Sequence, residues 1–259
     1  MAVLQDKYGQ PIYDFHDSIA KGEIPNHEEW SSMGERDNVS TTVTGEDIAP
    51  LAATTIPVPA AGGEQLTLVS DDVQDTDVGT GARRVTIEYL DGSGLEQTEI
   101  ITTDGTTGVD TVATDITFVN DMYVTGVGSN GVSEGEIIIY KKGAATTIYN
   151  VILEGGNKSL VINRKVPANK NLYITGWTLG SNGSKIMSVR LRATCTPDGD
   201  SVVPGFLFKR TLRIGGDSTF FERVSPPVKV CGGSFVKISA WAEAAGNDVS
   251  VSFNGYLEG

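Results

Sequence analysis

Short segments of alternating hydrophobic and polar residues run through most of the chain, beginning near residue 64. Leu66 and Leu68, and later Val85, Ile87 and Tyr89, are each separated by one polar residue. This period of two places the hydrophobic side chains on one face of a strand. No stretch has the length and the helical period of a crossover helix, which argues against an α/β fold. The pattern therefore predicts an all-β protein.

The alternation predicts two antiparallel β-sandwich domains of different length. Residues 64–141 have the pattern of about six strands, with a hairpin turn of sequence DGSG at residues 91–94. Residues 142–259 have the pattern of about eight longer strands, which suits a jelly-roll-like sandwich. Within this second domain, residues 187–195 give one clean hydrophobic face.

Residues 1–63 lack this alternation and predict an extended N-terminal arm with short helices. Residues 15–21 and 27–33 have helical spacing, and each follows a residue that can cap a helix. Both segments are shorter than a helix that is stable by itself. Residues 49–63 are rich in Pro, Ala and Gly and predict an extended tether.

The two short helices need a surface to lie on, which could be the protein's own sandwiches or a different protein. We expect a different protein, so that residues 1–63 anchor the molecule. Aromatic and large aliphatic side chains usually dominate the energy of such an interface. The predicted docking contacts are therefore Tyr13, Phe15, Ile19 and Trp30.

Charge is distributed unevenly along the 259 residues, whose net charge is −13. Residues 64–140 hold fifteen acidic and two basic side chains, whereas residues 141–259 hold eight acidic and fifteen basic ones. The two domains should therefore attract each other within one chain, or neighbouring copies should attract head to tail in a homo-oligomer. The acidic total argues against nucleic-acid partners and against docking to an anionic membrane. No apolar run is long enough to cross a bilayer, and no targeting segment is visible.

No motif for catalysis or for cofactor binding stands out. The string GVGSNG at residues 126–131 matches the spacing of a dinucleotide-binding loop. A strand pattern follows it where that fold needs a helix, so a turn is predicted. His16 and His27 are the only histidines, and both lie in the predicted arm, away from a rigid pocket for a catalytic triad. We therefore expect a non-enzymatic protein without a cofactor.

Three features leave alternatives open. The acidic loop at residues 71–77 is expected to be a solvated turn, although its carboxylates could also bind Ca²⁺. Cys195 is expected to pack as a small hydrophobic residue, with a disulfide to Cys231 as the alternative. Four aromatic residues are expected in the core, with a sugar-stacking platform as the alternative: Trp177, Trp241, Tyr173 and Tyr256.

Several strings of turn and strand residues resemble a group of virion structural proteins from tailed bacteriophages. They are YGQP at residues 8–11, VGTGARRVTIEYLDG at 78–92, EIITTDGTT at 99–107, VNDMYVTGVGSNG at 119–131, VPANKNLYITGW at 166–177, SVRLRA at 188–193, FFER at 220–223 and PVKV at 227–230. The resemblance covers most of the chain and includes no catalytic motif. It implies a place in the virion without choosing between head, collar and tail.

From the residues and this resemblance we expect a virion structural protein that is made in the host cytoplasm. Its partners would be capsid, portal or tail proteins and further copies of itself. The favoured form is a capsid decoration or head-fibre subunit that docks through residues 1–48. The alternatives are a tail or collar adaptor and a receptor- or glycan-binding module.

Overall fold

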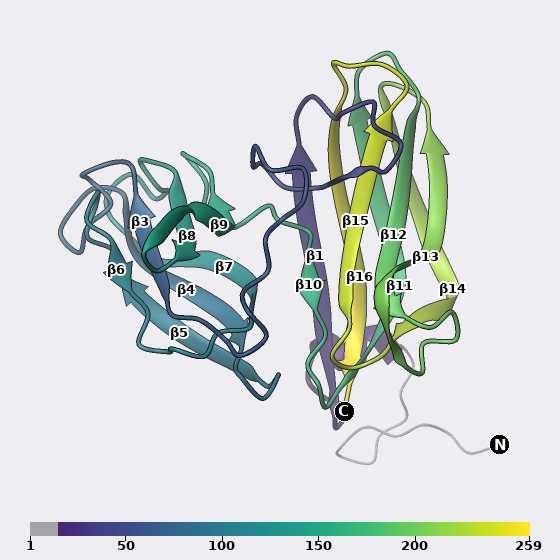
Figure 1. The fold of residues 1–259 in the computed structure, drawn as a ribbon, viewed down its shortest axis with the longest axis horizontal. Coiled ribbons are helices and arrows are strands. Elements are labelled where there is room, and N and C mark those ends of the chain that lie inside the picture. Colours follow the sequence, from purple (N-terminus) through teal and green to yellow (C-terminus); the bar gives the residue numbers. More distant parts are fainter. Residues whose placement is uncertain (1–14) are drawn as a thin grey trace.

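The structure is a computed structural model that describes residues 15–259, and it is all-β, as predicted (Figure 1). The strands in this range form four antiparallel sheets, and the one helix there is α1 (Phe15–Ala20). α1 occupies the first predicted helix and ends before Gly22, whose φ of +65° lies in the left-handed region. The described residues include no helix that is long and apolar enough to cross a membrane.

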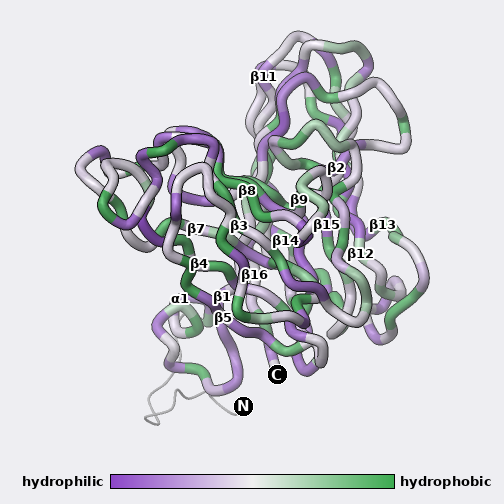
Figure 2. Tube along the Cα trace, turned by 60° about the vertical axis from the view of Figure 1, so that its left-hand side comes forward, coloured by the Kyte–Doolittle hydropathy of each residue, from purple (hydrophilic) through white to green (hydrophobic). Residues whose placement is uncertain are grey.

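Two of the sheets share one hydrophobic core and make up a smaller unit. Their strand orders are β6-β3-β8-β9 and β5-β4-β7. The core joins Leu68 and Ile139 of the first sheet to Ile87 and Met122 of the second, and Figure 2 shows the hydrophobic segments along β3, β4 and β8. The strands are β3 (Leu66–Ser70), β4 (Ala82–Leu90), β5 (Glu96–Thr102), β6 (Val109–Asp110), β7 (Phe118–Val127), β8 (Ile137–Lys141) and β9 (Ala144–Ile152).

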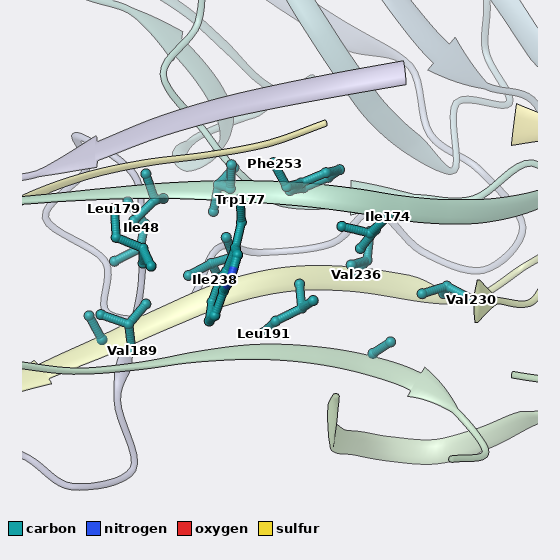
Figure 3. Close-up of a cluster of buried hydrophobic side chains, with 14 of the residues drawn as sticks. Ile48, Ile174, Trp177, Leu179, Val189, Leu191, Val230, Val236, Ile238 and Phe253 are labelled. Carbon is teal, nitrogen blue, oxygen red and sulfur yellow. The ribbon is translucent and has the colours of Figure 1, made fainter. Parts of the chain in front are cut away.

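The other two sheets share a second core and make up a larger unit. Their strand orders are β1-β16-β11-β14 and β10-β15-β12-β13, and β2 also pairs with β15. The core joins Ile174, Trp177 and Phe253 of the first sheet to Val189 and Ile238 of the second (Figure 3). The strands are β1 (His27–Arg36), β2 (Glu46–Asp47), β10 (Arg164–Lys165), β11 (Asn171–Asn182), β12 (Met187–Cys195), β13 (Val202–Ile214), β14 (Ser218–Val230), β15 (Phe235–Ala242) and β16 (Asp248–Glu258).

Along the chain, the smaller unit is inserted into the larger one. β1 and β2 precede it and β10 to β16 follow it, yet β2 and β10 both pair with β15. β1 pairs with β16 over its whole length, from His27 opposite Glu258 to Arg36 opposite Val249. Both sheets of the larger unit therefore depend on the segment that comes before the smaller unit.

Residues 27–33 do not form the predicted second helix, because they belong to strand β1. Ser32, Gly34 and Arg36 are buried, while Ser31 and Met33 are exposed and Glu35 is half-buried. As an edge strand, β1 pairs the backbone groups of every second residue with β16 along its whole length, whereas a helix of about seven residues leaves most of its end groups unpaired. A segment of seven residues is too short to distinguish the period of a helix from that of a strand.

The predicted tether and domain boundaries also need correction. Part of the predicted tether is packed, because Ala49 and Ile56 are buried in a small cluster with Val151 and Val161. β9 pairs with β8, so the smaller unit continues beyond the predicted boundary after residue 141. The predicted arm is likewise not a separate region, since it supplies β1 and β2 to the larger unit.

A disulfide joins Cys195 at the end of β12 to Cys231 just after β14, with the two Cα atoms 6.2 Å apart. Both residues lie in the core of the larger unit. The bond ties one sheet of this unit to the other, since β12 and β14 belong to different sheets. This is the alternative that the sequence left open for Cys195.

Candidate functional site

Phe15, one of the predicted docking residues, contacts the protein's own chain. Its ring packs edge-on against Tyr256 and against His27, with centroids 5.4 and 5.5 Å apart. His16 lies in the same cluster, 6.0 Å from the ring of Tyr256. Both histidines thus pack among aromatic side chains on the outer face of the β1-β16-β11-β14 sheet, where they help to fix α1.

The other described docking residues are also engaged within the chain. Ile19 is buried, and the ring of Trp30 lies 6.4 Å from that of Phe253. Tyr13 lies outside the described residues. The prediction that these side chains are free to grip a foreign protein is therefore corrected for Phe15, Ile19 and Trp30, because they hold α1 and β1 on the larger unit.

The four aromatic residues considered for a sugar platform lie on different surfaces. Trp177 is a core residue, 1% exposed, and its Nε1 donates a hydrogen bond to Glu222 at 2.6 Å. Tyr173 and Tyr256 stack on neighbouring strands with centroids 5.1 Å apart. Trp241 belongs to the opposite sheet. The four therefore do not form one platform.

The outer face of the β10-β15-β12-β13 sheet carries neighbouring aromatic and basic side chains. The guanidinium carbon of Arg190 lies 4.3 Å from the ring centroid of Phe208 and 4.2 Å from that of Trp241. Lys237 Nζ lies 4.2 Å from the centroid of Phe206. The period of two on three adjacent strands gathers these side chains, and cation–π attraction orders them. We call this the aromatic–basic face; its residues are Arg190, Arg192, Phe206, Phe208, Lys237 and Trp241.

The two arginines of the aromatic–basic face are only partly neutralised. Burial lowers the pKa of Arg192, and the nearby positive charge of Arg190 lowers it further. Arg192 donates to the carbonyl oxygen of Thr44 at 2.6 Å. The Nε atoms of both arginines are buried without a hydrogen-bond partner among the described residues. Lys237 is buried and paired with Asp47 at 2.6 Å, so the positive charge of this face comes from the two adjacent guanidinium groups.

Strand β13 borders this face and forms an open edge of its sheet. Phe206 and Phe208 are 38% and 56% exposed, and Val202 and Leu207 are exposed as well. Side chains on both faces of the strand are thus solvent-accessible. An exposed hydrophobic edge strand is a template for pairing with another chain. This edge, together with the aromatic–basic face, is the candidate interaction site.

Ion pairs and hydrogen bonds join the smaller unit to the larger one. Lys170 pairs with Glu28 of β1 and with Glu96 of β5. Burial disfavours the charge on Lys170, but the two carboxylates outweigh it and raise its pKa. Asn120 and Lys165 exchange two hydrogen bonds of 3.0 and 2.8 Å. Opposite charges therefore meet within one chain at this junction.

A cavity of about 460 Å³ opens beside the junction. Its lining includes Asp121, which lies 3.0 Å from Lys158 Nζ and 3.5 Å from Arg164 Nη2. Burial and a 3.0 Å hydrogen bond to Glu88 raise the pKa of Tyr123, also in the lining, to about 12. Of these pairs, only that of Asp121 with Arg164 of β10 joins the two units, since Tyr123 and Glu88 both belong to the smaller one.

The acidic loop after β3 is organised by one of its own carboxylates. Asp75 is buried and accepts hydrogen bonds of 2.6 to 3.0 Å from the Ser70 hydroxyl and from three backbone N–H groups. Asp71 and Asp77 are exposed, as expected for a solvated turn. Within residues 15–259, no three carboxylate, His or Cys side chains are grouped so that they could hold a metal ion.

Comparisons with known proteins give this chain no family. No family model matches it, and no curated protein matches it. Among solved structures, that of the infectious bursal disease virus Gt strain is similar over 94% of this chain and 77% of that chain, at 10% identity and a TM-score of 0.15. A similarity of this size carries no argument about fold or function.

Proposed function

We propose that this protein is a non-enzymatic structural component of a tailed-phage virion, in the form of a capsid decoration or head-fibre subunit. The observation that carries the proposal is the strand order of the larger unit. If β2 and β10 are counted as one interrupted strand, its two sheets have the orders 1-8-3-6 and 2-7-4-5 along the chain. Two four-stranded sheets connected in this way make a jelly roll, an architecture that viral capsid domains use.

The four sheets, in this proposal, are two β-sandwiches and not the blades of a four-bladed propeller. Each pair of sheets shares its own buried cluster. Propeller blades are four-stranded sheets repeated around a central channel. Here β1 pairs with β16, at the other end of the described chain, and β10, β15 and β12 lie side by side. The smaller sandwich is then an insertion into the second strand of the jelly roll, between its two pieces β2 and β10.

The proposed attachment to the particle differs from the arm-based one. Phe15, Ile19 and Trp30 are used inside the larger unit, so docking to the particle falls to other surfaces that are still open. A tail or collar adaptor would dock in the same way at another place in the virion. Because jelly rolls also occur in lectins and enzymes, the fold alone does not choose the function.

Purified particles of the encoding phage test the proposal. We expect mass spectrometry to find this chain in washed particles, and antibodies against it to label the head surface in electron micrographs. Label confined to the collar or tail would favour the adaptor. Absence of the chain from particles that retain their capsid and tail proteins would contradict a virion role of any kind.

A further inference from the structure

We propose that the open edge of β13, with the aromatic–basic face beside it, binds the acidic smaller unit of a second copy of this chain, so that copies associate head to tail. The inference holds whether or not the protein is a virion component. Three observations favour a second copy as the binding partner: an uncovered hydrophobic edge, opposite charge at the two ends of the molecule, and an acidic loop with exposed hydrophobic residues.

The edge of β13 exposes several large hydrophobic side chains to solvent. Val202 is 55% exposed, and Phe208 on the outer face and Leu207 on the inner face are also exposed. Monomeric proteins usually protect such edges with charges, prolines or a covering segment. Pro226 and Pro227 provide this protection on β14, the edge of the neighbouring sheet, and β13 carries Pro204 and Lys209 on either side of its segment 206–208. The hydrophobic side chains of that segment stay uncovered, which leaves a short stretch of this edge open to a partner.

The charges at the two ends of the molecule are complementary. Residues 64–152, which form the smaller unit, carry fifteen acidic and four basic side chains. Residues 187–230, from β12 to β14, carry seven basic and four acidic ones. The smaller unit lies at one end of the long axis, and β13 and β14 lie at the other (Figure 1). The two surfaces cannot meet within one molecule, so their attraction acts between copies.

The acidic loop at residues 71–78 is the part of the smaller unit that fits this edge. Val78 is 88% exposed and Val73 is 64% exposed, and both stand among aspartates. Buried Asp75 fixes the loop through its four hydrogen bonds, so little order would be lost on binding. Valines ringed by carboxylates would face phenylalanines that lie beside the two arginines. This gives a hydrophobic centre and a charged rim on both partners.

A head-to-tail contact joins two different surfaces, so each molecule keeps one free end after pairing. Such a contact grows into a closed ring or an open filament. A contact between two β13 edges would instead stop at a dimer related by a two-fold axis. The difference allows two variants of the full chain to distinguish the two arrangements.

The first variant, Phe206→Glu with Phe208→Glu, damages only the edge. The second, Asp77→Lys with Val78→Lys, damages only the loop. All four side chains are exposed, so both variants should keep the wild-type circular dichroism and melting temperature. Phe208→Glu alone, at a side chain that is 56% exposed, is a milder edge variant should the first fail to fold. Met33→Glu and Val112→Lys change exposed hydrophobic residues away from both surfaces and serve as matched controls.

Sedimentation velocity of the full chain gives the readout. We expect wild type and both controls to form species larger than a dimer at low salt. The apparent dissociation constant should increase about tenfold near 1 M salt, where the Debye length is about 3 Å and the charges are screened. Each variant alone should be monomeric, and an equimolar mixture of the two should form a heterodimer and nothing larger, because one intact contact remains. A monomeric wild type, or a loop variant that associates like wild type, would overturn the proposal.

Discussion

The two hydrogens of the Arg36 Nη1 atom are shared among the carbonyl oxygens of Asp47, Ala49, Leu51 and Ala53, which lie 3.1 to 3.3 Å from it. The Nε atom of Arg36 donates to a Glu46 carboxylate oxygen at 2.8 Å. One buried guanidinium thus folds the segment that the sequence suggests is a tether. Nothing in the spacing of prolines and alanines reveals this, because the acceptors are backbone atoms that every sequence has.

Replacing Arg36 by methionine should destabilise the larger unit strongly. The change keeps much of the side-chain volume but leaves Glu46 as a buried charge without its partner. Breaking a buried ion pair in this way costs about 3–5 kcal/mol in the free energy of unfolding. Urea unfolding measures the loss. Arg213→Met, at an exposed ion pair with Glu243, is the control and should cost less than about 1 kcal/mol. Equal losses for the two variants would contradict the role given to Arg36.

Glu64 should make the stability of the smaller unit depend on pH. Burial alone would raise its pKa, but hydrogen bonds from Lys141 Nζ at 2.6 Å and the Tyr149 hydroxyl at 2.5 Å lower it below the ordinary 4.5. A carboxyl whose pKa is lower in the folded state stabilises the fold above its unfolded pKa. This contribution is lost as the pH falls through the folded value.

Glu64→Gln should therefore be less stable than wild type at about pH 7, and the difference should shrink at about pH 3. Urea unfolding at the two pH values checks this. Glu154→Gln, at an exposed carboxylate, should leave the pH dependence unchanged. If Glu64→Gln loses the same free energy of unfolding at both pH values, the charge of Glu64 does not contribute to stability.

At the scale of elements, the sequence indicated strands well where alternation was long and poorly where it was short. Residues 187–195 have five alternating inward positions, and they form β12. β1 offers mainly Trp30 as a hydrophobic inward residue and otherwise buries Ser32, Gly34 and Arg36, so its sequence does not look like a strand that lines a core. Its strand character comes from pairing with β16, a contact across more than 200 residues that local patterns cannot contain.

Gly34→Ala tests whether β1 is packed as described. A Cβ atom at this position would lie 2.9 Å from Ile162 Cβ and 3.0 Å from the Leu160 carbonyl oxygen. The strand would have to shift, and overpacking of this kind costs about 1–3 kcal/mol. In a free arm, the same change would be neutral or slightly stabilising, because alanine restricts the unfolded chain. Thermal melts distinguish the two outcomes. Gly62→Ala, where a Cβ meets nothing within 4 Å, is the control.

The candidate interaction site was only partly readable from the sequence. The charge asymmetry and the possibility of head-to-tail association were visible as counts of acidic and basic residues. The aromatic–basic face was not, because Arg190, Phe208 and Trp241 come together only through the pairing of β12 with β13 and β15. The docking residues were chosen by type, and hydrophobic type alone does not say whether the partner is another protein or the same chain.

At the scale of the whole molecule, the insertion of one unit into the other decides how the protein should unfold. The two large buried clusters share no residue, and the units meet through polar contacts, a ring contact between Phe118 and Phe235, and the small cluster around Val151. In the sequence, the smaller unit is one continuous segment between β2 and β10. At about 100 residues, it has the size of an independent domain.

A fragment of residues 62–158 should therefore fold without the rest of the chain. We expect it to show one cooperative melting transition and strand-type circular dichroism. Calorimetry of the full chain should show two transitions, one of which matches that of the fragment. In a ring of propeller blades each blade depends on its neighbours, so the fragment would be unfolded and the full chain would melt in one step. The fragment experiment thus tests the proposed division into two sandwiches directly, independently of any assay for a virion.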